Sequence, residues 1–181
     1  MRAAILFADG FEEIEAVTPV DVLRRAGLDV SMVGVFGMEV KGAREVTFKM
    51  DCLLEDLFIE EYDVLILPGG LPGAHHLRDN DDVQNLIRDA HSLKKIIAAI
   101  CAAPVALEKA GILETKTITS HPSKEEELQC CEEYTQNRVE VDDNIITSRG
   151  PGTSLEFSFA ICEALGLNDK VNELKKAMLF K

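Results

Sequence analysis

The chain has 181 residues, of which 46% are hydrophobic, 28% charged and 6% aromatic. Disordered chains lack large apolar residues and disulfide-framed secreted modules carry far more Cys, so this composition excludes both classes. We expect one domain over residues 1–181, because this length supports a single hydrophobic core. The 19 basic and 32 acidic residues give a formal charge of −13, which opposes phosphate-rich partners, so we expect no nucleic acid binding.

The chain also lacks the features of a membrane or exported protein. Its longest apolar runs, such as Ile96–Ala103, are much shorter than the roughly 20 residues of a membrane-spanning helix. The N-terminal apolar segment reaches Asp9 before any small-residue cleavage site. The five Cys form no C-x-x-C pair, and we expect them to be thiols in a reducing compartment. The sequence therefore predicts a cytoplasmic protein without membrane contact.

Short apolar runs alternate with stretches of helical periodicity, which is typical of a mostly parallel sheet covered by helices on both faces. The first part of the chain predicts a strand over 3–8, a helix over 12–26 that Pro19 kinks or delays, a strand over 28–35, a hairpin over 37–50, a strand over 62–67 and a loop over 68–73. The second part predicts a helix over 80–92, a strand over 96–100, a helix over 102–110, strands over 117–120 and 138–148, and helices over 155–165 and 170–179. The acidic stretch 124–133 is expected to be a solvated surface segment.

The junction at Cys101 carries the clearest chemical signal. An apolar strand stops at this residue and an alanine-rich helix follows at once, which is the strand, nucleophile, helix order of a nucleophile elbow with Cys in place of Ser. A thiol that faces a helix N-terminus is expected to have a lowered pKa. We therefore predict that Cys101 is a nucleophile rather than a structural Cys.

Other strand-to-helix junctions predict the partners of this thiol, since ligands of such sheets bind beyond the carboxyl ends of the strands. Glu15 follows the first strand in an acidic turn with a single Gly, which disfavours a phosphate site. The glycines after Leu67 either permit a tight turn or supply N–H groups for an oxyanion. His121 follows the predicted strand 117–120 and is a candidate base or proton relay. No His or Cys cluster suggests a metal, so we predict none.

The remaining thiols lack this context. Cys162 falls in an apolar helical stripe and is expected in the core. Cys52, Cys130 and Cys131 are oxidisable residues to which we assign no catalytic role.

Seven segments carry a resemblance to a known family: Glu12–Glu15, Pro19–Gly27, Leu67–Gly70, Ala98–Ala102, His121–Pro122, Asn137–Glu140 and Thr147–Ser154. In this order they resemble the ThiJ/PfpI superfamily, and within it the DJ-one branch. The resemblance implies a flavodoxin-like three-layer α/β/α sandwich with a mostly parallel sheet, a nucleophile elbow and a homodimer.

The resemblance also implies roles for individual residues. Cys101, Glu15 and His121 are the implied catalytic residues, and the implied oxyanion or substrate-binding groups are Gly69, Gly70 and Ala102. Four Arg are implied near the site or the dimer interface: Arg24, Arg25, Arg44 and Arg149. Glu15 is expected to be protonated beside a thiolate, because two adjacent negative charges cost free energy. Ala103 stands where the family often has Gly, and Lys49 where some members have an oxidisable Cys.

The implied activity is that of a cofactor-independent, glutathione-independent glyoxalase or deglycase. It converts 2-oxoaldehydes such as methylglyoxal to 2-hydroxy acids, with a role in oxidative and carbonyl stress. The alternative is a redox-sensing, chaperone-like protein that acts through oxidation of Cys101 without turnover. A thiamine-metabolism enzyme and a cysteine protease are weaker alternatives, the latter because Pro122 and Ser123 follow His121 in place of an acid.

Overall fold

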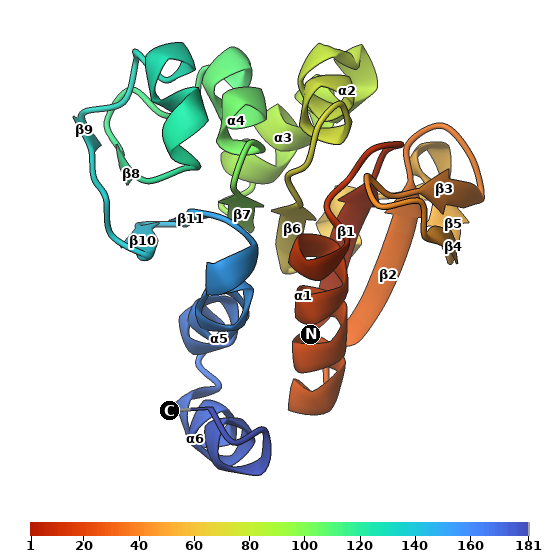
Figure 1. Ribbon diagram of the computed structural model, residues 1–181, viewed down its shortest axis with the longest axis vertical. Coiled ribbons are helices and arrows are strands. Elements are labelled where there is room, and N and C mark those ends of the chain that lie inside the picture. The colour runs from red at the N-terminus through yellow and green to blue at the C-terminus, as the bar shows by residue number, and fades with distance from the viewer. Residues whose placement is uncertain (181) are drawn as a thin grey trace.

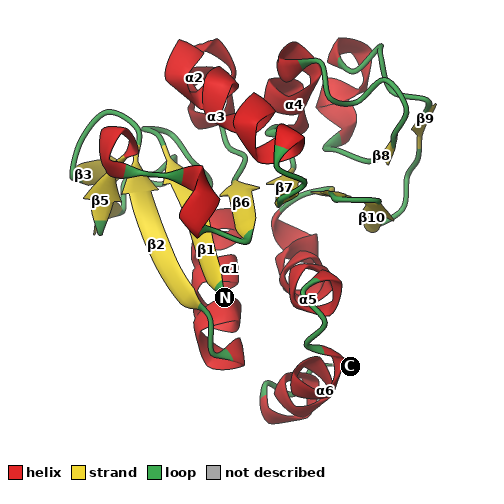
Figure 2. Cartoon of the chain, turned by 180° about the vertical axis from the view of Figure 1, so that it is seen from behind, coloured by secondary structure: helices red, strands yellow, loops and turns green. Residues whose placement is uncertain are grey.

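The computed structural model describes residues 1–180. Within them a seven-stranded central sheet has the order β10-β11-β7-β6-β1-β2-β5 (Figure 1). Neighbouring strands are parallel except for β10 and β11, which form an antiparallel hairpin. Helices lie on both sides of this sheet (Figure 2), and the structure confirms the expected three-layer, flavodoxin-like α/β/α arrangement.

The strands of the central sheet are β1 (Arg2–Phe7), β2 (Asp29–Gly34), β5 (Cys52–Leu53), β6 (Val64–Leu67), β7 (Ile96–Ile100), β10 (Val139–Asp142) and β11 (Ile145–Ser148). One side is covered by α1 (Glu13–Ala26), α5 (Ser154–Ala164) and α6 (Asn168–Ala177), and the other by α2 (Gly73–Asp79), α3 (Asp81–Ser92) and α4 (Pro104–Ala110). Two small sheets stand apart, the β3–β4 hairpin (Glu39–Lys41, Thr47–Lys49) and the parallel pair β8 (Thr117–Ile118) and β9 (Glu133–Tyr134). The short 3₁₀ helices are η1 (Leu54–Asp56), η2 (Ile59–Glu61), η3 (Pro122–Glu127) and η4 (Pro151–Thr153).

The core consists of two layers separated by the sheet. In β1, Ala4 and Leu6 pack with the α2, α3 and α4 side, while Ile5 and Phe7 pack with the α1, α5 and α6 side. All four side chains are fully buried. A parallel strand covered on both faces reads as a continuous apolar run, which is why the sequence indicated this strand clearly.

Several expected elements differ from the structure. The expected strand 117–120 is shorter and pairs only with β9, so it lies outside the central sheet. Helix α4 begins at Pro104 instead of residue 102, and α1 runs through Pro19 without a delayed start. Helix α2 and strand β5 were not predicted. The stretch 124–133 is not wholly solvated, because Lys124 and Leu128 are buried.

Candidate active site

The backbone turns sharply at Cys101, where β7 ends. This residue has φ 64°, in the left-handed region that residues other than Gly rarely adopt and that costs about 1–2 kcal/mol. Hydrogen bonds from neighbouring segments hold the turn: the Cys101 N–H donates to the Ser148 carbonyl at 2.8 Å, and the His121 N–H donates to the Cys101 carbonyl at 2.9 Å. The expected elbow geometry is present, and it is fixed by residues far away in the sequence.

The loop after β6 brings backbone N–H groups to the same place. The Gly70 and Ala102 N–H groups both donate to the Cys101 sulfur. Gly70 has φ 89°, and a Cβ there would clash with the Glu12 N and the Gly10 O. Only glycine fits this position, because both the backbone conformation and the close approach of neighbouring backbone exclude a side chain.

Glu15 enters the site from the first turn of α1. Its side chain is fully buried, and its Oε2 accepts a hydrogen bond from the Gly69 N–H at 2.9 Å. This contact corrects one expectation: Gly69 holds the carboxyl group, so its N–H is not free to bind an oxyanion as we had expected. The other carboxyl oxygen, Oε1, has no partner of its own apart from the neighbouring Cys101 thiol.

Glu15 and Cys101 form a coupled acid pair. Burial raises the pKa of Glu15 to about 7, although the hydrogen bonds to Cys101 and Gly69 oppose the shift. Burial, followed by the charge of Glu15, also raises the pKa of the Cys101 thiol, and the Gly70 and Ala102 N–H groups only partly offset this. The sequence predicted that the helix N-terminus lowers the pKa of the Cys101 thiol. This prediction was wrong, because burial and the charge of Glu15 together raise that pKa. The pair gives up one proton readily and retains the second, because two negative charges in contact are costly.

His121 reaches the site although its strand lies outside the central sheet. Its imidazole is exposed, and its Nδ1 accepts a hydrogen bond from the Ser123 N–H at 3.2 Å. In the neutral ring this places the proton on Nε2, which becomes the donor. The ring carbon next to Nε2 lies 3.9 Å from the position that a Cβ on Gly150 would occupy.

The turn at Gly150 had no predicted role in the site, and Gly150 appeared only within the segment Thr147–Ser154 of the family resemblance. A Cβ on this residue would lie 3.8 Å from Glu15 Oε1 and 4.0 Å from Cys101 Sγ. Gly150 follows β11, the neighbour of β7 in the sheet, so four adjacent strand ends, those of β11, β7, β6 and β1, converge here. The order Ser-Arg-Gly-Pro-Gly after an apolar strand is the signal from which this turn was recognisable.

The four Arg fall into different surroundings. Arg149 precedes Gly150, and its Nη1 lies 3.5 Å from Thr119 Oγ1. Arg44 is exposed in the β3–β4 turn, where its N–H donates to Glu13 Oε1 at 2.6 Å. Arg24 and Arg25 lie near the far end of α1, roughly 14–15 Å along the axis from Glu15. They form ion pairs with Asp51 at 3.1 Å and Asp21 at 2.8 Å, so neither reaches the thiol site.

The other thiols lie outside this constellation. Cys162 is fully buried, which confirms the expected core position. Cys52 and Cys131 are half-buried, and Cys130 is exposed. Within residues 1–180 no group of three or more His, Cys, Asp and Glu side chains is arranged to hold a metal ion. In the same residues no helix has both the length and the apolar character needed to cross a membrane.

Comparison with known proteins gives the family. The DJ-1/PfpI family matches residues 1–164. The chain belongs to this family. Parkinson disease protein 7 homolog of Danio rerio is 42% identical over 99% of this chain and 97% of its own length. The glutathione-independent glyoxalase DJR-1.2 of Caenorhabditis elegans is 34% identical over 92% of this chain and 89% of its own length.

The fold agrees with this assignment. The crystal structure of Drosophila melanogaster DJ-1beta matches with a TM-score of 0.95 and 40% identity, over 99% of this chain and 98% of that one. The resemblance drawn from the seven sequence segments is thereby confirmed. As a DJ-1/PfpI family member, the chain presents its buried Glu15, its elbow Cys101 and the donor loop at adjacent strand ends of a flavodoxin-like sheet.

Proposed function

We propose that the protein is a glutathione-independent glyoxalase that converts 2-oxoaldehydes such as methylglyoxal to 2-hydroxy acids. The observation that carries the proposal is the fully buried Glu15 carboxyl group, whose Oε1 has no partner other than the adjacent Cys101 thiol. A covalent nucleophile and a base that share one buried site are what an internal oxidation and reduction of two neighbouring carbons requires. The glyoxalase name of the Caenorhabditis elegans relative supports the same reaction.

The first step is addition of Cys101 to the aldehyde. The thiol becomes reactive when its proton passes to the ionised Glu15 carboxylate, which places the charge on sulfur, where the Gly70 and Ala102 N–H groups donate to it. The sulfur forms a bond to the aldehyde carbon, and the carbonyl electrons move to oxygen, which takes the proton from Glu15 and leaves that carboxylate ionised. The product is a hemithioacetal. As the charge moves from sulfur to oxygen, the hydrogen bonds of these N–H groups can pass from the sulfur to the oxyanion that develops.

The second step moves a proton between the two carbons. Glu15, once ionised, removes the hydrogen from the former aldehyde carbon, and the electron pair forms an enediol. The His121 Nε2–H donates toward the oxygen of the second carbon. Return of the proton to that carbon leaves a thioester on Cys101, which water hydrolyses to the 2-hydroxy acid and the free thiol. One carbon is oxidised and its neighbour reduced, so the sum is methylglyoxal plus water giving lactate and a proton.

The proton transfer is tested by running the reaction in deuterated water. Deuterium is expected on the second carbon of the product, at a level set by exchange from Glu15. The Glu15→Gln variant is expected to form the hemithioacetal, detected by mass spectrometry as an adduct on Cys101, and to release at least about 100-fold less lactate. Full activity of Glu15→Gln would refute the assigned role. Early glycation adducts of proteins are the next substrates to assay, since they present the same carbonyl chemistry.

A second candidate function is redox sensing through the same pair. Protonated Glu15 would donate a hydrogen bond to a sulfinate on Cys101, because its Oε1 has no other partner. Mild peroxide treatment followed by mass spectrometry is expected to place two oxygens on Cys101 ahead of Cys130 and Cys131. Oxidation confined to Cys130 and Cys131 would remove the basis of this function.

A further inference from the structure

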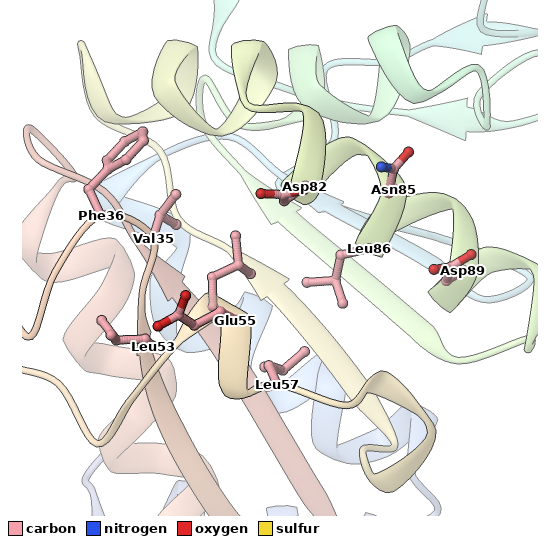
Figure 3. A pocket seen from close by; sticks show the side chains of 10 residues that line it. Val35, Phe36, Leu53, Glu55, Leu57, Asp82, Asn85, Leu86 and Asp89 are labelled. Carbon is pink, nitrogen blue, oxygen red and sulfur yellow. The ribbon is translucent and has the colours of Figure 1, made fainter.

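A pocket lies on the α3 side of the sheet, apart from Cys101. It has a volume of about 530 Å³ and lies between α3 and the chain that leads from β5 through η1 (Figure 3). Its apolar lining comes from six side chains: Val35, Phe36, Leu53, Leu54, Leu57 and Leu86. None of the residues that line it belongs to the candidate active site. This volume falls in the range of small-molecule sites.

The pocket arises from the edge of the sheet. β5 has only two residues and is followed by η1, so the edge strand ends early. Helix α3 packs against α2, α4, β7 and η2. The short strand leaves α3 facing the 53–57 segment across the pocket, as the labelled side chains in Figure 3 show.

The rim of the pocket carries negative charge on both walls. Asp82 and Asp89 come from α3, and Glu55 comes from η1. In the described part of the chain none of these three carboxylates forms an ion pair. Among residues 1–180 the lining includes no Lys, Arg or His. Arg88 precedes Asp89 in the chain, but its guanidinium donates to Asn85 Oδ1 at 3.2 Å and forms no ion pair with Asp89.

The spacing of these charges defines the shape of a ligand. Asp82 and Asp89 are seven residues apart on α3, which is two helical turns and roughly 10.5 Å along the axis. They therefore share one face of the helix. Leu86 lies between them on that face and contributes to the pocket floor. The order along the wall is thus carboxylate, apolar surface, carboxylate, with Glu55 on the opposite wall.

We propose that this pocket binds a linear aliphatic polyamine, with two terminal ammonium groups at Asp82 and Asp89 and the intervening methylene chain over Leu86. An ammonium group is a compact donor that pairs with carboxylates, and an alkyl chain gains free energy when it covers apolar surface. Glu55, on the opposite wall, adds a third carboxylate to the lining. A ligand with one ammonium group satisfies only one end of this arrangement.

The distance between Asp82 and Asp89 along α3 decides which ligands test the proposal. Octamethylenediamine has two ammonium groups about 11 Å apart when extended, which matches the distance between Asp82 and Asp89. Putrescine carries the same charge, but its ammonium groups are only about 6 Å apart. Octanediol keeps the long methylene chain and lacks charge. Calorimetric titration of the full chain at low ionic strength is expected to show octamethylenediamine binding more tightly than either control ligand, and weakening as salt is added.

Matched variants test the location. Asp82→Asn and Asp89→Asn are each expected to weaken octamethylenediamine binding about three- to fivefold, the range for solvent-accessible ion pairs. Asp81→Asn removes a carboxylate one position away that does not line the pocket, and it is expected to leave the affinity unchanged. All three residues are exposed, and circular dichroism will confirm that the variants are folded.

Four results would overturn the proposal. Absence of octamethylenediamine binding at millimolar concentration would remove it outright. Equal weakening by Asp81→Asn would mean that the ligand responds only to the general acidity of the chain. Equal affinity for octanediol would mean that the apolar floor acts alone, and equal affinity for putrescine would contradict the two-ended arrangement.

Discussion

Replacing Glu15 with Gln is expected to stabilise the protein increasingly as pH rises. Most substitutions of a buried hydrogen-bonding group have the opposite effect and destabilise the fold. Glu15 is fully buried and accepts a hydrogen bond from the Gly69 N–H. The oxygen of Gln can accept the same hydrogen bond, and its NH₂ group can face the Cys101 sulfur. The substitution therefore keeps the shape of the site while removing a group that must become charged in a buried position.

The sign and size follow from the raised pKa. Burial moves the pKa of Glu15 from its ordinary value of 4.5 to about 7. Between these pH values the folded state binds more protons than the unfolded state, so the free energy of unfolding falls as pH rises. A rise of this size corresponds to a total loss of about 3 kcal/mol, complete above the folded pKa. The amide of Glu15→Gln does not titrate, so the variant does not lose this stability. Its free energy of unfolding, relative to that of the wild type, is expected to rise by up to about 3 kcal/mol between pH 4.5 and pH 8.

Urea unfolding followed by circular dichroism, at half-unit steps across this pH range and under reducing conditions, measures the difference directly. Glu126→Gln is the control, because Glu126 is exposed and forms no ion pair within residues 1–180. It is expected to follow the wild-type curve. A difference between Glu15→Gln and wild type that stays constant with pH would refute the reasoning about the buried carboxyl group.

Three further predictions concern the rest of the structure. Gly69→Ala places a Cβ 2.5 Å from Glu15 Oε2 and 2.7 Å from Cys101 Cβ. It is therefore expected to lower the free energy of unfolding by about 1–3 kcal/mol and to slow alkylation of Cys101. The control Gly152→Ala places a Cβ with nothing within 4 Å and is expected to change neither quantity. Lys124→Met removes a buried ammonium that contacts Glu127 Oε1 at 2.6 Å and His75 Nε2 at 3.3 Å, and we expect it to cost about 1–3 kcal/mol by thermal unfolding. The control is Lys170→Met, at a half-exposed Lys that also pairs with a Glu, and we expect it to cost less than about 0.5 kcal/mol. Light scattering is expected to report a homodimer that Ile14→Asp converts to monomer, because Ile14 is 53% exposed beside an apolar hollow of Val17, Leu155, Met178 and Phe180; a monomeric wild type would contradict this.

The central sheet and the elbow could be predicted from the sequence because their signals are local. The strand that ends at Cys101 is an uninterrupted apolar run followed by small residues, and the strand before Glu15 has the same character. Parallel strands place their carboxyl ends together, so the proximity of these two residues follows once the strands are recognised.

Other features depended on contacts between distant segments. Helix α2 begins in a Gly- and Pro-rich stretch that favours a loop by propensity, and it forms where it packs against α4. The segment 117–120 alternates like any half-buried strand, and nothing local shows that its partner is β9 instead of the central sheet.

The sequence predicted which residues form the site better than it predicted their pKa values and hydrogen bonds. The helix N-terminus after Cys101 suggested a lowered thiol pKa, whereas burial by the loops that carry Gly70 and Gly150 dominates and raises it. Likewise, the sequence placed Gly69 among oxyanion donors, but the path of the loop directs its N–H to Glu15. Which donor meets which acceptor is a property of the folded loop and has no signature in residue types alone.

The central claim is that Cys101 makes this protein a glyoxalase without help from glutathione. The most direct test is lactate formation from methylglyoxal by purified, reduced protein, with a chelator present and glutathione absent, compared with Cys101→Ser under the same conditions. We predict lactate from the wild type and a loss of at least about 1,000-fold in the variant, because the serine hydroxyl is a far weaker nucleophile without a strong adjacent base. Equal lactate formation by folded Cys101→Ser, or none from the folded and reduced wild type, would contradict the account.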